Sequence, residues 1–407
     1  MKPKRILILV ENLPSPFDRR VWQEATTLRD AGYVVSIICP TGRGCEARFE
    51  AIDGIEIWRY ALPTEGAGAA GYLVEYAAAL FWTFALSLRV LLRRGFDVVH
   101  ACNPPDLFFL IGGFYKLFGK KFLFDHHDAN PELYVAKFGR KDFFYRLMLA
   151  LERWTFRTAD VSIATNLSYR RIALERGGMP PERVFVVRSG PSLERLKVLP
   201  PVPALKRGRK YLVGYVGVMG RQEGLDYLLQ AAAHIVHQLG RTDVHFGLVG
   251  GGTSLDEMKA LAAELGVADY VTFTGRVPDA ELLALLNTAE VCVNPDIATE
   301  MNDISTMNKI MEYMALGKPI VQFDLAEGRY SAQAASLYAR RNDAVDLAAK
   351  IVELLDDPAR RQQMGEYGRR RVIEELEWRH EVPKLLAAYE ALWPAAAALP
   401  RPRDKTA

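Results

Sequence analysis

Short apolar, β-branched runs alternate with longer amphipathic stretches along the first half of the chain. A stretch carrying Val21, Trp22, Ala25 and Leu28 predicts a first amphipathic helix, and two long apolar stretches predict further helices. Buried strands are predicted at residues 6–10, 34–39, 55–60, 97–101, 121–125, 161–164 and 184–187. Because strands that are apolar throughout have both faces covered, this alternation indicates a parallel sheet with helices on each side.

The alternation restarts after residues 196–210, a stretch with three prolines, a basic cluster and no periodicity that is typical of a linker. Beyond it, strands are predicted at 211–216, 245–249, 270–274, 291–294 and 319–324, with helices between them. The sequence therefore predicts an α/β protein with two doubly wound sheets. The predicted segments are an N-terminal domain at 1–195, the linker at 196–210, a C-terminal domain at 211–375, and a helix at 376–395 that packs back toward the N-terminal domain.

Length, charge and cysteine usage narrow the class of protein. The 407 residues suit two domains of roughly 150–200 residues each. The four cysteines form no Cys-x-x-Cys motif, and the apolar run at 6–10 is too short for a secretory signal, so we expect a cytoplasmic protein. Residues 1–195 carry 27 Lys and Arg against 21 Asp and Glu, a surplus of +6 within a net charge of +3. This surplus is too small for a nucleic-acid partner, but it suits a domain resting on an anionic surface.

Glycine-rich loops follow three predicted strands of the second domain, at the sheet edge where doubly wound folds bind ligands. Glycines let backbone N–H groups approach a phosphate, and an arginine can chelate two phosphate oxygens. A tight turn with a solvated arginine is the alternative explanation. The residues concerned are Gly217, Gly220 and Arg221 in the first loop, Gly250, Gly251 and Gly252 in the second, and Gly275, Arg276 and Val277 in the third.

The strongest local signal is the segment at 302–321, where Ser305 or Thr306 can cap a helix that begins near Met307 and Asn308. Lys309 lies near the start of this helix, where the helix dipole disfavours a cation unless an anion shares the site. Glu312 follows three residues later on the same helix face. A surface Lys–Glu pair is the alternative, but we favour an anion-binding site.

In the first domain, His126, His127 and Asp128 directly follow the predicted strand at 121–125, where a catalytic or acceptor-binding group is expected. Adjacent side chains on an extended backbone point to opposite faces, so the two histidines do not suit a joint metal site, and a core histidine is an alternative for one of them. Further polar residues at this edge of the sheet are Asn12, Asn103, and Arg19 and Arg20 at the start of the first helix. We expect Asn12, Arg19, Asn103 and His126 on the acceptor side.

In chain order, six segments together resemble the retaining glycosyltransferases of family four, which have the GT-B architecture. They are PFDRRVWQEATTLRDAGYVVSIICP, FDHHDANPE, YVGVMGRQEGLDYLLQAA, LVGGG, FTGRVP and STMNKIMEYMALGKPIVQFD. The resemblance extends over nearly the whole chain and implies two Rossmann-like domains that face each other across a cleft. It implies a nucleotide-sugar donor mainly on the second domain and a glycan or lipid-linked acceptor on the first.

Carried over by position, the resemblance implies that Glu312 holds the donor ribose and that Arg221 faces the diphosphate. Val277, beside Arg276, would contact the base through its backbone, and His127 with Asp128 would line the reacting sugar. The catalytic set implied is His127, Asp128, Arg221 and Lys309. Donor-binding residues would be Gly217, Gly220, Arg221, Gly250, Gly251, Arg276, Val277, Ser305, Thr306, Met307, Asn308, Lys309 and Glu312.

The chain departs from the family pattern at three places. Ile304 stands where the paired-glutamate motif has its first glutamate, and Val218 and Glu223 replace the arginine and lysine of the donor loop. The first βα loop lacks the usual glycine pair. Two alternatives stay open: a catalytically silent sugar-nucleotide-binding protein, which Ile304 favours, and a GT-B nucleotide-sugar epimerase. A Rossmann dehydrogenase fits worst because no Gly-x-Gly-x-x-Gly follows the first strand.

Retaining transfer in this family is described as a front-face displacement through an oxocarbenium-like state. The protein then has to stabilise the leaving diphosphate and position the acceptor hydroxyl, which cations and helix N-termini can do. We therefore expect no cofactor and no essential metal. This also agrees with the absence of an Asp-x-Asp or Cys/His cluster placed as a ligand set.

The stretch at 72–92 is apolar nearly all round and approaches the about 20 residues that a membrane span needs. Glu75, Ser87 and Arg89 interrupt it, so a buried helix is the alternative. Residues 89–157 carry 12 Lys and Arg against 7 Asp and Glu, interleaved with aromatic residues in KLFGKKFLF and KFGRKDFFYRL. We predict peripheral contact with the inner face of the membrane, and a role in polysaccharide or glycolipid biosynthesis.

Overall fold

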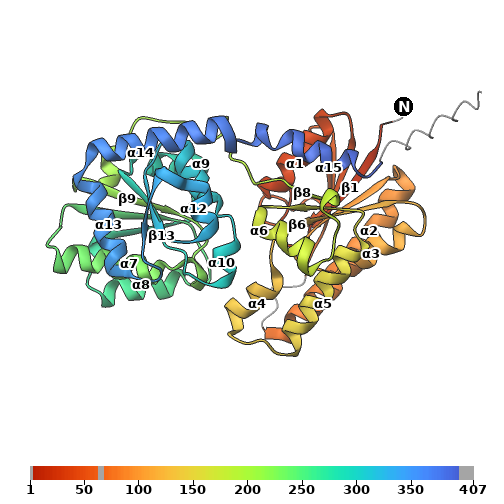
Figure 1. The fold of residues 1–407 in the computed structure, drawn as a ribbon, viewed down its shortest axis with the longest axis horizontal. Helices are drawn as coiled ribbons and strands as arrows, with labels where there is room; N and C mark the ends of the chain where they lie inside the picture. Colours follow the sequence, from red (N-terminus) through yellow and green to blue (C-terminus); the bar gives the residue numbers. More distant parts are fainter. Residues whose placement is uncertain (1–2, 63–67, 394–407) are drawn as a thin grey trace, which may run out of the picture. The chain divides into compact units, whose positions relative to one another are not determined.

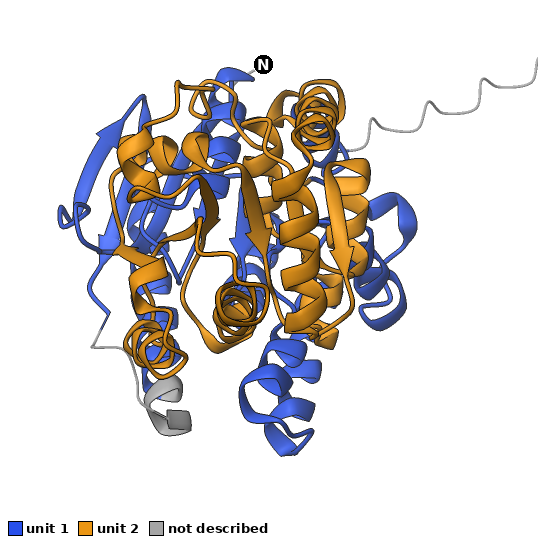
Figure 2. Cartoon of the chain, turned by 90° about the vertical axis from the view of Figure 1, so that its left-hand side faces the viewer, with its two compact units in different colours: residues 1–187, 382–407 blue, residues 188–381 orange. Residues whose placement is uncertain are grey.

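A computed structural model describes residues 3–62 and 68–393, and of residues 68–73 it describes the backbone alone. The side chains of residues 72 and 73, at the start of the apolar stretch at 72–92, are therefore not described. Residues 394–395 of the predicted C-terminal helix also lie outside the described residues. The chain divides into two compact units (Figures 1 and 2). The first unit comprises Met1–Val187 and Val382–Ala407, and the second Arg188–Glu381.

The first unit contains an eight-stranded sheet in the order β3-β4-β2-β1-β5-β6-β7-β8, parallel except for the edge strand β3. Its strands are β1 (Arg5–Leu9), β2 (Val34–Pro40), β3 (Phe49–Ile52), β4 (Ile55–Tyr60), β5 (Val98–Cys102), β6 (Lys121–His126), β7 (Val161–Ala164) and β8 (Val184–Val186). Strand β3, which the apolar pattern did not predict, pairs with β4 through a two-residue turn at Asp53 and Gly54. Both turn residues have positive φ, as a tight hairpin with a right-handed strand twist requires.

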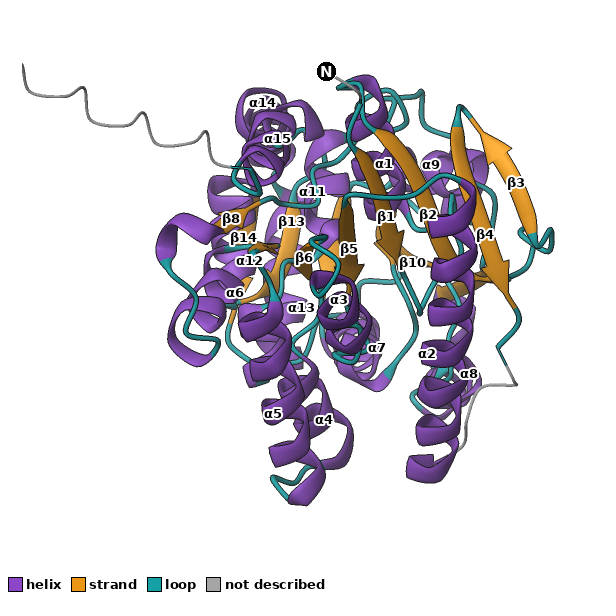
Figure 3. Cartoon of the chain, turned by 90° about the vertical axis from the view of Figure 1, so that its right-hand side faces the viewer, coloured by secondary structure: helices purple, strands orange, loops and turns teal. Residues whose placement is uncertain are grey.

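Helices cover both faces of this sheet. They are α1 (Arg19–Asp30), α2 (Gly68–Arg93), α3 (Phe109–Lys116), α4 (Asn130–Phe138), α5 (Phe143–Thr158), α6 (Leu167–Arg171) and α15 (Val382–Glu390). Figure 3 shows α2, α3 and α5 on one face, with α2 and α5 extending past the strands. Helix α1 buries Val21, Ala25 and Leu28, the apolar stripe that predicted it. Helix α15 packs against β7 and β8.

The second unit contains a six-stranded parallel sheet in the order β11-β10-β9-β12-β13-β14. Its strands are β9 (Tyr211–Val216), β10 (Val244–Val249), β11 (Val271–Gly275), β12 (Val291–Asn294), β13 (Ile320–Phe323) and β14 (Ser336–Ala339). Its helices are α7 (Leu225–Ala233), α8 (Leu255–Glu264), α9 (Asp279–Thr288), α10 (Glu300–Ile304), α11 (Asn308–Ala315), α12 (Ala326–Ala332), α13 (Ala344–Asp356) and α14 (Pro358–Arg371). The strand order reverses between β9 and β12, and the loops after these strands form the edge where such sheets bind ligands.

Short turns complete both units. Single π-helical turns at Ile172–Arg176, His234–Gln238 and Val372–Leu376 extend α6, α7 and α14. Short 3₁₀ turns lie at Pro181–Arg183, Pro203–Lys206, Arg221–Glu223, Ala268–Tyr270, Gln333–Ala335 and Trp378–His380. The predicted fold class, an α/β chain with two doubly wound Rossmann-like sheets, is confirmed.

The segment predicted as a linker at 196–210 is instead an ordered part of the second unit. Leu196 is buried in that unit's core. The backbone N–H of Leu199 donates to Asn287 at 3.0 Å, and that of Val202 donates to Thr288 at 2.8 Å. The boundary therefore falls after Val187, earlier than the predicted residue 195, and residues 376–381 also belong to the second unit.

Candidate active site

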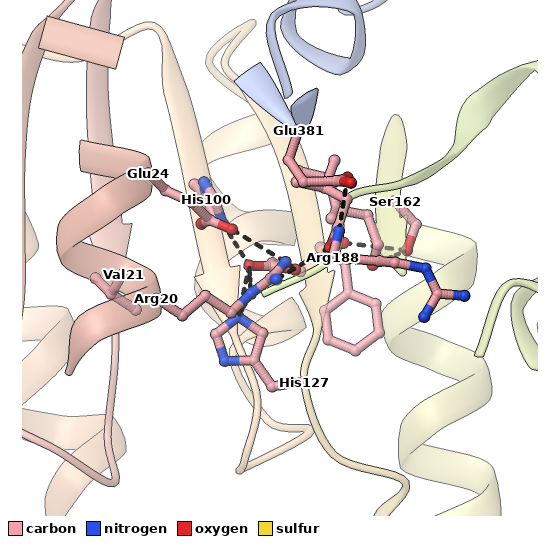
Figure 4. Close-up of polar contacts among 12 residues, drawn as sticks. Arg20, Val21, Glu24, His100, His127, Ser162, Arg188 and Glu381 are labelled. Atoms are coloured by element: carbon pink, nitrogen blue, oxygen red, sulfur yellow. Dashed lines mark hydrogen bonds and ion pairs between the residues drawn. The ribbon is translucent and has the colours of Figure 1, made fainter. Parts of the chain in front are cut away.

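In the first unit, a buried arginine, a carboxylate and a histidine meet at the carboxyl end of β6 (Figure 4). Arg20 lies in the first turn of α1, where Asp18 caps the helix by accepting the N–H of Val21. Nη2 of Arg20 is 2.9 Å from Oδ1 of Asp125, and its Nε is 3.4 Å from Oδ2. Nε2 of His127 lies 2.5 Å from the same Oδ2 and 3.0 Å from Nε of Arg20. The three side chains form a triangle of charge-assisted contacts.

The electrostatics of this triangle determine the proton position on His127. Burial raises the pKa of the Asp125 carboxyl, but Arg20 and His127 outweigh burial and hold that pKa well below its ordinary value. A lone pair on Nε2 would face the ionised Asp125 carboxylate at 2.5 Å, so we assign the hydrogen to Nε2 and the imidazole lone pair to Nδ1. The Nε–H of Arg20, which lies within reach of both Nε2 and Oδ2 of Asp125, then donates to Oδ2. In Figure 4 this second ring nitrogen lies on the side of the ring away from the dashed contacts. The side chain is 13% exposed, so Nδ1 can accept a hydrogen bond or a proton from a sugar hydroxyl.

Asn103, at the end of β5, holds the turn that carries His127. Its Oδ1 accepts the backbone N–H groups of His127 at 2.7 Å and of Asp128 at 3.2 Å. Its Nδ2 donates to the carbonyl of Asp128 at 2.7 Å and to Asp106 at 3.0 Å. The predicted acceptor-side role of Asn103 is corrected here: its buried amide positions His127 and Asp128.

The other predicted residues of this edge divide into core and surface. His126 is fully buried among the rings of Phe124, Phe156 and Tyr169, so its predicted place on the acceptor side is corrected to a core histidine. Burial lowers the pKa of His126 to about 3, so this ring is neutral. Asn12 and Arg19 are exposed after β1 and at the start of α1. Burial raises the pKa of Asp128, which His127 partly offsets.

In the second unit, the glycines of the β9 and β10 loops bring two backbones together. The N–H of Gly217 donates to the carbonyl of Val249 at 3.1 Å. Gly250 has a φ of +134°, and a Cβ there would collide with the carbonyl oxygen of Gly217. A Cβ at Gly251 would lie in ordinary contact with the side chain of Arg276. A Cβ at Gly217 would in turn collide with the hydroxyl of Tyr215, so both glycines are needed for packing, whether or not a phosphate also binds there.

The arginines of these loops lie at the surface. The side chain of Arg221 is 86% exposed, with the nearest carboxylate, Glu257, at 3.8 Å. Arg276 is also exposed, beside the partly buried Val277 that packs on the core. Gly220 begins the turn that presents Arg221. Both guanidinium groups are accessible to an anion.

Lys309 is held by protein carboxylates. Its Nζ is 2.6 Å from Oε2 of Glu223 and 2.8 Å from Oδ1 of Asp296, and it lies 5.0 Å from the ring centroid of Tyr215. Burial disfavours the ammonium, but Asp296 holds the pKa of Lys309 well above its ordinary value. Burial raises the pKa of Asp296 to about 6, although Lys309 opposes this rise. A cation near the start of a helix needs a nearby anion, and here the carboxylates of Glu223 and Asp296 provide it. Lys309 is therefore not part of a surface pair.

Glu312, on α11, accepts a hydrogen bond from Nη1 of Arg195 at 2.9 Å. The same guanidinium binds Asp279 through Nε at 2.6 Å and Nη2 at 3.2 Å. Glu312 keeps 15% of its side chain exposed. Its carboxylate is therefore oriented by Arg195 at the edge of the second unit's sheet.

The start of α11 differs from the predicted cap. Met307 occupies the N-cap position and makes no side-chain cap hydrogen bond, and Asn308 is exposed. Ser305 donates to the carbonyl of Met301, and Thr306 lies 3.4 Å from both Glu327 and Nη1 of Arg188. The predicted cap by Ser305 or Thr306 is wrong because the chain turns through α10 first.

Both units match known protein families over most of their length. Residues 18–190 match the glycosyl transferase 4-like domain, and residues 210–357 match glycosyl transferases group 1. The sucrose-phosphate synthase of Thermosynechococcus elongatus has a similar fold, with a TM-score of 0.75 at 20% identity, covering 97% of this chain and all of that one. The chain has the domains and the fold of a GT-B glycosyltransferase.

Among relatives of the chain, 2-deoxystreptamine glucosyltransferase from Streptomyces kanamyceticus is 28% identical over 255 residues, which span 60% of this chain and 64% of the relative. The MMP alpha-(1→4)-mannosyltransferase from Mycolicibacterium hassiacum is 27% identical over 76% of this chain and 74% of the relative. Anabaena HepE in complex with UDP and glucose has a TM-score of 0.71 at 15% identity, covering 95% of this chain and 99% of that one. The chain thus spans less than two thirds of the first relative.

Among the residues that the structure describes, two sets of side chains, all buried except the partly exposed His127, bring potential metal-ligand atoms close together: Glu24, Asp125 and His127, and His100, Cys102 and Asp125. Nη2 of Arg20 lies 3.0 Å from Glu24 and 2.9 Å from Asp125. A guanidinium cation therefore already occupies the place that a divalent ion would take in the first set. Independence from metal stays a prediction.

Sequence reasoning did not identify the contacts that several charged residues make at the candidate site: Arg20, Asp125, Arg195, Glu223 and Asp296. Arg20 and Glu24 are four residues apart beside the buried stripe of α1, a spacing that could have indicated burial of both. Asp125 ends an apolar strand, which could have indicated a functional carboxylate. The partner of Lys309 had no comparable signal, because Glu223 stands in a loop far away in the chain.

Proposed function

We propose that the chain is a retaining glycosyltransferase that moves a sugar from a nucleotide-sugar donor to a glycan or lipid-linked acceptor. The second unit would hold the donor and the first unit the acceptor, in the assembly of a cell-surface polysaccharide or glycolipid. The observation that carries the proposal is His127 on the glycosyltransferase 4-like domain. Its Nε2 is fixed by an ionised carboxylate, while its Nδ1 stays available at the ligand-binding edge of the sheet.

The donor side rests on groups suited to a nucleoside diphosphate. Helix α11 begins without a side-chain cap, so its first N–H groups can meet an anion. Arg221 is exposed and can grip two phosphate oxygens, and Glu312 is held where a carboxylate can accept ribose hydroxyls. Anabaena HepE, which has this fold, was solved in complex with UDP and in complex with UDP-glucose, which supports a nucleotide-sugar donor.

In this reaction the protein acts electrostatically. As the sugar–phosphate bond breaks, positive charge develops on the sugar ring and negative charge on the leaving diphosphate. Arg221 and the α11 N-terminus would stabilise the leaving group, and Nδ1 of His127 would hydrogen-bond a hydroxyl near the reacting carbon. These charges are supplied by the chain, so the reaction needs no cofactor and no metal.

Peripheral membrane contact is the second part of the proposal, and it rests on the surface of the first unit. The segment Val74–Arg93 of α2 is long and apolar enough to cross a membrane, and 22% of an apolar 18-residue stretch within it is buried. The side of α2 that packs on β2 and β4 buries polar Thr83 and Ser87, which suits a sheet-covering helix better than a span. Large apolar side chains stay exposed on α2, directly after α3, and on α4 and α5: Val74, Phe81, Trp82, Leu88, Leu92, Leu117, Phe118, Phe138, Phe143, Phe144 and Trp154.

Basic residues accompany these apolar side chains, including Arg93 and Arg94 at the end of α2, and Arg140 and Lys141 before α5. Apolar insertion with cationic attraction is the usual composition of an interfacial surface on anionic lipid. A glycosyltransferase placed in this way at the inner face of the membrane would reach a lipid-linked acceptor.

The proposal is tested with the purified full chain. A panel of nucleotide sugars is first screened by thermal shift, and the stabilising donor is then incubated with membrane extracts and simple glycosides. We expect sugar transfer with the same anomeric configuration in product and donor, as measured by NMR. Conversion of the donor without any acceptor would identify an epimerase. Binding with no turnover on any acceptor would identify a silent binding protein, and an inverted product would contradict retention.

A further inference from the structure

We propose that Tyr389, on the C-terminal helix, is a positioning residue that fixes the tautomer of His100 and thereby the orientation of Asp125 and His127. The expected effect on rate rests on the proposed function, but the proton assignment itself does not. Tyr389 lies on α15, far from His127 in the chain, and belongs to the same unit.

The geometry joins four side chains in series. The hydroxyl of Tyr389 is 2.6 Å from Nδ1 of His100, and both residues are fully buried. Nε2 of His100 is 3.5 Å from Oδ2 of Asp125, the oxygen that also contacts His127 at 2.5 Å. His100 lies on β5, which pairs directly with β6. The ring of Tyr389 is further held by the ring of Tyr33, at 5.6 Å between centroids.

Burial makes both members of the first contact neutral. It raises the pKa of Tyr389 well above its ordinary value and lowers the pKa of His100. A neutral imidazole carries one N–H, so only two arrangements are possible. Either Tyr389 donates to Nδ1 and the Nε2–H faces Asp125, or Nδ1–H donates to Tyr389 and the Nε2 lone pair faces Asp125.

The groups around Nε2 decide between these arrangements. Asp125 is ionised, and a lone pair facing a carboxylate oxygen at 3.5 Å is repelled, whereas an N–H dipole is attracted. Glu24 lies 3.7 Å from Nε2, beyond hydrogen-bond reach, and burial raises its pKa well above the ordinary value. Cys102 is likewise kept protonated by burial, which raises its pKa. The nearby Arg20 cation disfavours a doubly protonated His100. The arrangement with Nε2–H facing Asp125 therefore prevails.

The phenol hydroxyl stabilises this tautomer by donating to Nδ1. In the other tautomer this hydroxyl would have to accept the Nδ1–H, and its own proton would turn away from its partner inside the core. Without the hydroxyl that cost is absent, so moving the proton to Nδ1 costs less, although Asp125 still opposes it. The lone pair on Nε2 would then push against Oδ2 of Asp125, the atom that holds His127. The orientation of His127 would loosen although no residue of the triangle had changed.

Tyr389→Phe tests the proposal, with Tyr33→Phe as a control that removes a phenol hydroxyl from the adjacent ring. Histidine ring ¹⁵N NMR of the full chain reports the tautomer, and His100→Gln identifies the His100 signals. We expect His100 protonated on Nε2 in the wild type and in Tyr33→Phe, and shifted toward Nδ1 in Tyr389→Phe. In transfer assays, kcat of Tyr389→Phe should fall about fivefold, the rate equivalent of one neutral hydrogen bond, with an unchanged KM for the donor.

A wild-type His100 protonated on Nδ1 would overturn the proposal, as would a Tyr389→Phe variant whose His100 keeps the wild-type tautomer. An equal loss of kcat in Tyr33→Phe would also overturn it, because the effect would then be structural. A wild type that has the expected tautomer but transfers no sugar would contradict the proposed function while supporting the proton assignment.

Discussion

Replacing Arg221 by alanine tests which cation holds the donor diphosphate. The structure offers two candidates that differ in environment: Arg221 is 86% exposed, whereas Lys309 is buried and bonded to Glu223 and Asp296. Hydrogen bonds to charged groups contribute about 1.5–3 kcal/mol, so losing the contact should lower kcat/KM for the nucleotide sugar about 10- to 150-fold. The loss should appear in kcat if the contact strengthens as the diphosphate leaves, and in KM if it does not.

The stability of the variants separates the two candidates. Arg221→Ala should change the free energy of unfolding by less than about 0.5 kcal/mol, because the side chain is at the surface. Lys309→Met should destabilise the fold by about 3–5 kcal/mol, because it leaves buried carboxylates without their cation. Arg221→Lys should retain part of the rate, since a lysine lacks the guanidinium fork.

Steady-state kinetics with the donor identified by thermal shift, calorimetry with the nucleoside diphosphate, and urea unfolding supply these quantities. Arg370→Ala, which removes an exposed arginine from α14, is the matched control and should leave all three unchanged. Wild-type kinetics and donor affinity in Arg221→Ala would refute the assignment. If Lys309→Met were then inactive while still folded, Lys309 would be the phosphate cation.

Four further outcomes follow from the described contacts. Glu312→Ala should weaken nucleotide binding by about 1.5–3 kcal/mol in calorimetry, and an unchanged affinity would reject the ribose contact. Burial raises the pKa of Asp296 to about 6, so its protonated form stabilises the fold at low pH. About 2.5 kcal/mol of that stability should disappear as the pH rises from 4 to 7, and urea unfolding of Asp296→Asn should lack this component. The protein should sediment with anionic liposomes at low salt. Leu92→Asp on α2 should reduce this binding more than Val345→Asp, the control, which changes an exposed apolar residue on α13. Equal losses in the two variants would argue against membrane contact through α2. EDTA should leave transfer unchanged, and activity restored only by added manganese would show a metal requirement.

The fold was largely predictable because most strands are buried on both faces and read as short apolar runs. The exceptions have physical reasons. Strand β3 alternates between exposed and half-buried positions at the sheet edge, so it has no apolar run, although its Asp53–Gly54 turn is a hairpin signal. The segment at 196–210 resembles a linker because of its prolines, yet its backbone N–H groups are satisfied by polar side chains at the end of α9, including Asn287 and Thr288.

The site was less predictable because its chemistry depends on partners distant in sequence. The position of His127 after a strand was sufficient to select it, but its proton assignment depends on Asp125 and on Arg20 from another element. Neighbouring residues also separate according to burial: Arg20 is buried while Arg19 is exposed, and His126 is in the core while His127 reaches the surface. A position at the end of a strand is enough to identify a candidate segment. The direction of each side chain around the helix axis, or its place in the pleat of the strand, decides which of two neighbouring side chains points inward.

Glu223 and Lys309 have to be interpreted together. Considered alone, Glu223 suggests a donor loop that has lost its phosphate contact, because the glycosyltransferase family that the sequence resembles has a lysine at this position. In the structure that glutamate bonds Lys309 at 2.6 Å, and Lys309 also bonds Asp296 at 2.8 Å. Above pH 6, where Asp296 is mainly ionised, two carboxylates face one ammonium and the group carries a net negative charge. Such a group repels a diphosphate rather than binding it. If the donor is a nucleotide sugar, its phosphates therefore need a cation from outside this group, and Arg221 is exposed on the adjoining loop.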